Sequence, residues 1–214
     1  MTTLDGTRIG QESLAGWAYL IKALHTRIHT PDYATGLALV AGIGAAAEEA
    51  DHHPDLDLRY GHLDVRLTSH DAGGVTDRDV ALARTITALA AQAGSSLDPT
   101  ISRLELALDT PDFGKVAPFW QATLGLVHRQ DEAVDPAGSL PTVWFQESGA
   151  EEPRQRWHLD VWIDPAEVPR RIEAVLAAGG RLVTDTYAPS YWVLADPDGN
   201  MACLCTWQGD SPPD

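Results

Sequence analysis

Apolar residues recur at helical spacing in two stretches near the start of the chain. Residues 14–24 carry leucine, tryptophan and isoleucine at about every third or fourth position, and residues 33–47 show similar spacing. Such spacing gathers apolar side chains on one helix face, so each stretch predicts an amphipathic helix. Pro54 disfavours helical geometry at the residue before it. The second helix should therefore end at or before His52 and His53, leaving both imidazoles on an extended segment.

Alternation of apolar and polar residues replaces this spacing over residues 58–70, which predicts a strand. Gly61 interrupts the alternation and predicts a bulge or bend. After a turn at residues 73–74, Thr76 stands where a helix N-cap is expected, with Asp79 three residues later. Apolar residues at helical spacing continue to position 90, so a third helix should begin here.

A change of composition divides the chain near residue 97. Residues 93–100 combine glycine, serine, aspartate and proline, which is typical of a linker. We therefore expect one domain over residues 1–96 and a second over residues 97–214.

The second domain contains two similar segments. Residues 104–125 and 158–180 each predict a strand, a turn containing aspartate and proline, and a helix ending at glycine, followed by short strand-like runs. This similarity predicts two βαβββ modules, and the alternation in the runs favours an antiparallel over a parallel sheet. The expected fold class is α+β, an N-terminal antiparallel sheet with helices on one face followed by the paired modules.

Charge and composition limit which partners and which location are expected for the protein. The 214 residues include 31 acidic and 15 basic side chains, a formal net charge of −16. This charge repels phosphate backbones and anionic membranes, so we expect neither nucleic acid nor membrane as partner. No stretch approaches the roughly 18 apolar residues that span a bilayer, and the first residues lack an export signal, so we expect a cytoplasmic location. Cys203 and Cys205 would form a strained disulfide and are predicted to be reduced thiols.

Four of the eight histidines fall within nineteen residues, and their spacing limits what they can do together. His52 and His53 are adjacent on an extended segment, so their side chains should point to opposite sides and not share one metal. His62 and His70 would lie about 26 Å apart along a strand that rises roughly 3.3 Å per residue. Tertiary contact could still join His70 to one or both of the adjacent pair. With the carboxylates Glu48 and Asp79 nearby, such a group suits proton transfer near neutral pH better than metal binding.

The segment EEADHHPDLDLRYGHLDVRLTSHDAGGVTDRDVALA resembles the signature of the pterin-4a-carbinolamine dehydratases, and the likeness extends over about residues 10–93. It implies that the domain dehydrates a 4a-hydroxytetrahydropterin to a quinonoid dihydropterin by histidine acid/base catalysis, as a hydro-lyase without metal or cofactor. The small-molecule pterin is then the expected partner, in a homo-oligomer. The residues that the resemblance places at the catalytic site are His52, His53, His70, Asp79 and Glu48.

Simpler interpretations stay open for these residues. Asp79 also fits a purely helix-capping role, and His62 fits a solvated strand position. The chain also departs from the family, because Leu56, Ile28 and Thr30 stand where aromatic residues are usual, and stacking on a pterin would be weaker without them.

A second resemblance covers residues 101–209. The runs FWQATLG, HLDV and WVLADPDGNMACLC, together with the doubled module, resemble the glyoxalase-like branch of the vicinal-oxygen-chelate superfamily. In that superfamily the paired modules hold a divalent metal, and the corresponding positions here are Glu105, His158 and Cys203. Such a set could bind zinc, but cysteine among apolar neighbours is more commonly a core residue, so no metal is the preferred expectation. The alternatives to dehydration are metal-dependent lyase or dioxygenase chemistry in this domain, or non-catalytic binding of a small ligand.

Overall fold

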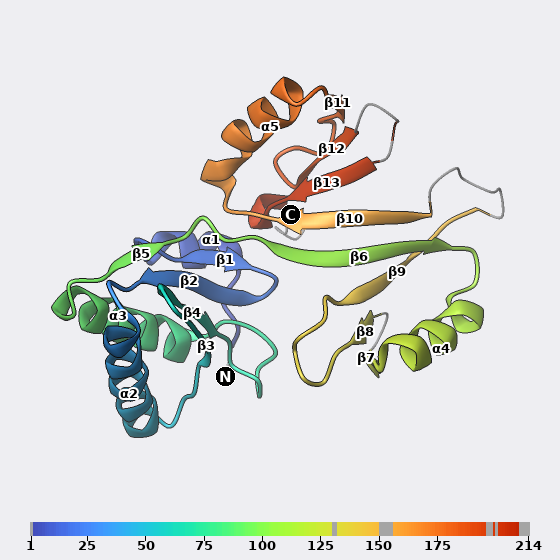
Figure 1. The fold of residues 1–214 in the computed structure, drawn as a ribbon. Coiled ribbons are helices and arrows are strands. Elements are labelled where there is room, and N and C mark those ends of the chain that lie inside the picture. Colours follow the sequence, from blue (N-terminus) through green and yellow to red (C-terminus); the bar gives the residue numbers. More distant parts are fainter. Residues whose placement is uncertain (1, 130–131, 150–155, 196–198, 200, 210–214) are drawn as a thin grey trace. The chain divides into compact units, whose positions relative to one another are not determined.

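The computed structural model describes residues 2–129, 132–149, 156–195, 199 and 201–209. The chain forms two compact units (Figure 1). The first comprises residues up to Ile101, the segment Ile163–Glu167 and a segment that begins at Trp207; the second comprises Ser102–Trp162 and Val168–Thr206. In the part of the chain that the structure describes, no helix combines the length and the apolar character needed to cross a bilayer.

The first unit is an antiparallel sheet packed with two long helices. Its strands follow the order β1-β2-β4-β3, and β5 also pairs with β2. The helices α2 and α3 contact each other and pack against the sheet (Figure 1). Fully buried side chains from both layers, including Ile28, Ile43, Leu63 and Ile86, form the core. The elements are α1 (Gly6–Gln11), β1 (Ala18–Leu20), β2 (Ala23–His29), α2 (Tyr33–Ala50), β3 (Asp55–Arg59), β4 (His62–Leu67), α3 (Asp77–Gln92) and β5 (Ser96–Asp98), with the 3₁₀ helices η1 (Pro165–Glu167) and η2 (Trp207–Gly209).

Two predicted elements of this unit are wrong in the same way. Residues 14–24 form no helix but a turn and the β1–β2 hairpin, whose two-residue turn, Ile21-Lys22, has φ values of 48° and 57°. Residues 58–70 are not one bent strand, because Tyr60 and Gly61 form the turn between β3 and β4. In both places a two-residue turn shifts the phase of the alternation, and the shifted pattern imitates a helix or a bulged strand.

The two remaining helix predictions are confirmed by their caps. The side chain of Asp32 caps the start of α2, and Asp51 ends this helix in the left-handed conformation with a φ of 47°. Thr76 and Asp79 form the predicted capping box at the start of α3. The histidine pair follows Asp51, on the extended segment that Pro54 favours.

The second unit is an eight-stranded sheet built from two modules of strand, helix and three strands, as predicted. Its order is β11-β12-β13-β10-β6-β9-β8-β7. Five neighbouring pairs are antiparallel, as the alternation favours, whereas β6–β9 and β10–β13 are parallel. The elements are β6 (Arg103–Thr110), α4 (Phe113–Leu124), β7 (Val127–Arg129), β8 (Glu132–Val134), β9 (Val143–Glu147), β10 (Trp157–Trp162), α5 (Val168–Ala177), β11 (Arg181–Thr184), β12 (Tyr191–Ala195) and β13 (Met201–Cys205).

The central strands of this sheet bring distant parts of the chain into register. Asp160 on β10 lies opposite Glu105 on β6 and opposite Cys203 on β13. Residues opposite each other in neighbouring strands point to the same face of a sheet. His158 precedes Asp160 by two positions and therefore shares this face. The face opposite α4 thus collects ionisable side chains from three strands.

Candidate active site

His52 is the most constrained of the predicted histidines. It follows the left-handed residue Asp51 that ends α2, and its ring is buried. Its Nε2 atom donates a hydrogen bond of 2.7 Å to Oδ1 of Asp79, whose side chain is completely buried in the first turn of α3. Because a carboxylate only accepts, the ring proton is held at Nε2. The second ring nitrogen, Nδ1, then carries no proton when the imidazole is neutral.

Asp79 is held by further donors. Its Oδ2 atom accepts hydrogen bonds of 2.7 Å from Ser69 Oγ and 2.7 Å from the backbone N–H of Thr76, and the Thr76 hydroxyl donates at 3.2 Å. Asp79 therefore caps its helix and anchors His52 at the same time. A carboxylate that accepts several short hydrogen bonds holds its donors in a fixed geometry.

The other predicted residues lie at the surface around this buried pair. His53 Nε2 donates to Glu48 Oε1 at 2.9 Å, and both side chains are more than half exposed, at 57% and 79%. The two adjacent histidines thus have different surroundings, His52 buried on Asp79 and His53 exposed beside Glu48. His70 is exposed in the turn after β4, and its neighbour Ser69 donates to Asp79, which ties this turn to His52.

His62 lies at the other end of β4, where it is paired with Arg59 on β3 and with His29 on β2. The strand geometry predicted this separation from His70.

The face of the second unit carries a separate cluster. His158 Nδ1 lies 3.2 Å from Asp160 Oδ1, and the group of potential metal ligands among the described residues is His158, Asp160 and Cys203, whose ligand atoms all lie within 4.8 Å of one another. Glu105 is not part of this group, and its Oε2 atom accepts a hydrogen bond of 2.8 Å from Trp162 Nε1. Sequence reasoning missed Asp160, although its position two residues after His158 on a strand could have revealed it.

Hydrogen bonding changes the pKa of one member of this cluster, His158. The hydrogen bond with Asp160, followed by the interaction with Cys203, raises the pKa of His158 to about 10. Burial raises the pKa of the neighbouring Cys205 thiol. Both cysteines are free thiols, as predicted.

Comparison with known proteins finds a matching family model for each of the two parts of the chain. The family model described as pterin 4 alpha carbinolamine dehydratase matches residues 3–89. A relative from Thermomicrobium roseum, provisionally named a pterin-4-alpha-carbinolamine dehydratase, is 38% identical over 92 residues, which cover 42% of this chain and 99% of the relative. The chain belongs to the pterin-4-alpha-carbinolamine dehydratase family. A relative from Halobacterium salinarum with the same provisional name is 47% identical over 82 residues, 38% of this chain and 89% of its own length.

The chain adds a second domain to this dehydratase-family region, since a model described as glyoxalase-like domain matches residues 105–205. Among solved structures, a transcriptional coactivator/pterin dehydratase from Brucella melitensis is 29% identical, with 42% of this chain and 99% of that chain covered and a TM-score of 0.41. A glyoxalase/bleomycin resistance protein/dioxygenase superfamily member from Vibrio splendidus is 15% identical, with 50% and 99% covered and a TM-score of 0.34.

A pocket of about 270 Å³ lies between α2 and α3, and His52 is one of its lining residues. His52 and Arg78 supply its main polar side chains, and alanines of both helices supply much of the rest. The Arg78 guanidinium pairs with Asp71, while its buried Nε has no hydrogen-bond partner among the residues that the structure describes. Sequence reasoning missed Arg78, although it stands directly before Asp79.

The positions where the dehydratase family usually has aromatic residues lie in or beside the core. Ile28 is fully buried, Thr30 is 8% exposed, and Leu56 is half-buried against the same core. Their side chains therefore contribute to packing in this chain.

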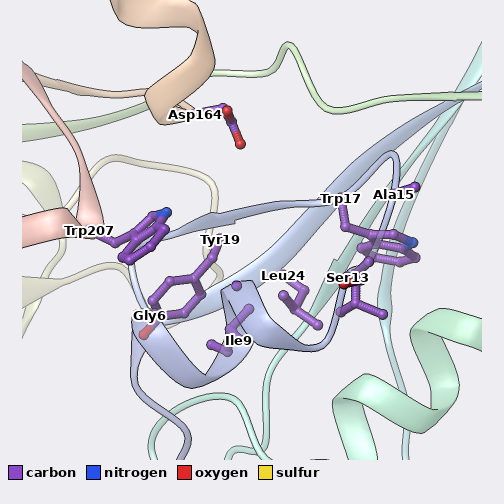
Figure 2. A pocket seen from close by; sticks show the side chains of 11 residues that line it. Gly6, Ile9, Ser13, Ala15, Trp17, Tyr19, Leu24, Asp164 and Trp207 are labelled. Atoms are coloured by element: carbon purple, nitrogen blue, oxygen red, sulfur yellow. The ribbon is translucent and has the colours of Figure 1, made fainter.

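A larger cavity of about 370 Å³ lies elsewhere in the first unit (Figure 2). The aromatic rings of Trp17, Tyr19 and Trp207 and the carboxylate of Asp164 line it, together with residues of α1. Trp207 packs so closely on α1 that a Cβ atom at Gly6 would lie 2.4 Å from the indole. Among the described lining residues, none belongs to the predicted histidine site.

Proposed function

We propose that the N-terminal domain, residues 1–96, dehydrates a 4a-hydroxytetrahydropterin to a quinonoid dihydropterin, and that residues 97–214 form an accessory ligand-binding domain. Membership of the dehydratase family supports this class of reaction. The observation that carries the proposal is the buried pair of His52 and Asp79, whose carboxylate also accepts a hydrogen bond from the residue next to His70.

The reaction needs two proton transfers. The bond between C4a and its hydroxyl oxygen breaks, and the hydroxyl leaves as water once it has received a proton. N5 gives up its proton, and the electron pair of the N5–H bond forms the double bond between N5 and C4a. Imidazole can give or take a proton near neutral pH, and a well-placed group contributes about 10²–10⁴-fold to the rate.

The histidines divide into two kinds suited to these transfers. The His52 ring is fixed at Nε2 by Asp79, so Nδ1 is the atom available for transfer to a bound pterin. His53 and His70 are exposed and can exchange protons with water. Glu48 accepts the hydrogen bond that orients His53, and we assign it that positioning role. One fixed ring and two solvent-accessible rings thus supply both transfers and restore the starting protonation.

The adjoining pocket supports a small planar substrate. Its volume of about 270 Å³ is just below the range of roughly 300–1,000 Å³ that is typical of drug-sized ligand sites, so it suits a small bicyclic ring. Arg78 places a cationic donor in the lining. In our proposal this guanidinium binds the 4-oxo group of the pterin.

The test is the decay of 4a-hydroxytetrahydropterin, followed spectroscopically with purified full-length protein. His52→Gln keeps a donor for Asp79 but removes the titratable ring, while His53→Ala and His70→Ala remove exposed rings. Each should slow the catalysed rate by about 10²-fold or more, and the matched control His62→Ala should not. Wild-type decay at the spontaneous rate, with intact ligand bound and recoverable, would instead indicate a non-catalytic binding protein.

A further inference from the structure

The sheet of the second unit brings together three atoms that metals prefer. His158 and Asp160 alternate on β10 and Cys203 lies opposite Asp160 on β13, which is the neighbouring strand (Figure 1). Their ligand atoms lie within 4.8 Å of one another. Ligands around a tetrahedral zinc ion lie roughly 3.3–3.7 Å apart, given bonds of about 2.0–2.3 Å. Small side-chain movements would therefore close this set around an ion.

Side chains outside this group of three already orient two of its members. Trp144 Nε1 donates a hydrogen bond of 3.0 Å to Asp160 Oδ2, which leaves Oδ1 directed toward His158. On the far side of the imidazole, Asp109 Oδ1 lies 3.4 Å from His158 Nε2, in ion-pair range though not aligned for a hydrogen bond. A carboxylate beside the second ring nitrogen is the usual support for a metal-bound histidine. Nδ1 and Oδ1, which are 3.2 Å apart, remain the inward atoms.

These three ligands differ from the metal ligands that the superfamily resemblance implies. Glu105, the expected ligand, lies opposite Asp160 in the register but is bonded to Trp162. Asp160 offers the oxygen in its place. A nitrogen, an oxygen and a sulfur ligand together suit zinc better than magnesium or calcium, which prefer oxygen alone.

We propose that His158, Asp160 and Cys203 bind one zinc ion, with Asp109 and Trp144 as positioning residues and Glu105 outside the coordination sphere. Zinc takes the place of the proton between Nδ1 and Oδ1. Three protein ligands leave one coordination position for water or a bound ligand. The proposal is independent of the dehydratase reaction, since all of these residues belong to the second unit.

The test measures metal binding itself. Purified full-length protein is freed of metal with a chelator and titrated with Zn²⁺ in a calorimeter, and with Co²⁺ while thiolate-to-cobalt charge-transfer absorption is recorded. We expect one ion per chain and a charge-transfer band. Cys203→Ser should abolish the band, whereas Cys205→Ser, two residues along the same strand, should retain it. Asp160→Asn should weaken zinc binding by at least about 100-fold and Asp109→Asn by about 10–100-fold.

Glu105→Gln is the control that separates the two ligand sets. It removes the carboxylate opposite Asp160 on the next strand and should leave zinc affinity within about twofold of wild type. Far-ultraviolet circular dichroism of each variant verifies that it is folded. Absence of stoichiometric zinc binding by the wild type overturns the proposal, as does a loss of affinity in Glu105→Gln that exceeds the loss in Asp160→Asn.

Discussion

The replacement Asp79→Asn tests the anchor of the candidate active site. It keeps the shape of the side chain but exchanges one acceptor oxygen for an N–H₂ group. In the wild type, His52 donates to Oδ1, while Ser69 and Thr76 donate to Oδ2. With the amide oxygen kept toward Ser69 and Thr76, the N–H₂ group faces His52 Nε2, which accepts this donor only when the ring proton moves to Nδ1. The hydrogen bonds to residue 79 then lose their charge assistance, which is worth about 1 kcal/mol for each bond, so the free energy of unfolding should fall by about 1–3 kcal/mol.

Urea unfolding followed by circular dichroism measures this loss, provided the slope of free energy against urea concentration is unchanged. The same change places the proton of the His52 ring on Nδ1, the atom that our proposal needs for transfer, so pterin dehydration should slow by about 10²-fold or more. The matched control is Asp77→Asn, two residues earlier on the exposed side of the same helix, which should cost less than about 1 kcal/mol and leave the rate unchanged. If Asp79→Asn behaves like Asp77→Asn in both assays, the anchoring role is wrong.

Three further predictions concern stability, which chemical or thermal unfolding measures; the first also concerns the rate of dehydration. Ser69→Ala should cost about 1 kcal/mol and slow dehydration, because it removes a buried donor to Asp79; an unchanged rate would separate Ser69 from the site. Gly6→Ala should destabilise the chain, because its Cβ would lie 2.4 Å from the Trp207 indole, whereas Gly10→Ala meets the same ring at an ordinary 3.7 Å and should not; equal effects would contradict this packing. Ile43→Ala, at a fully buried position, should cost about 2–5 kcal/mol, and a smaller loss would mean that the core closes over the cavity.

Local signals in the sequence predicted much of the candidate site. The proline after His53 and the spacing of Thr76 and Asp79 define where two helices end and begin, and both rules act over a few residues. Alternation along an extended segment likewise predicted that His52 and His53 point apart. None of these rules requires knowledge of the tertiary fold.

The parts that were not predicted depend on contacts between distant segments. The bond from Ser69 to Asp79 and the place of Arg78 in the pocket follow from packing a turn and a helix against α2. In the second unit, the register between β10 and β13 places Cys203 opposite Asp160. A shift of one residue in that register would exchange the faces of the sheet, and sequence spacing alone does not set it.

The most direct test of the central claim compares the rate of 4a-hydroxytetrahydropterin loss with wild-type protein, with His52→Gln and without protein, under identical conditions. The account predicts that wild-type protein accelerates the loss well above the spontaneous rate and yields the quinonoid dihydropterin. It also predicts that His52→Gln loses about 10²-fold of this acceleration or more. Wild-type protein that leaves the spontaneous rate unchanged would contradict the account.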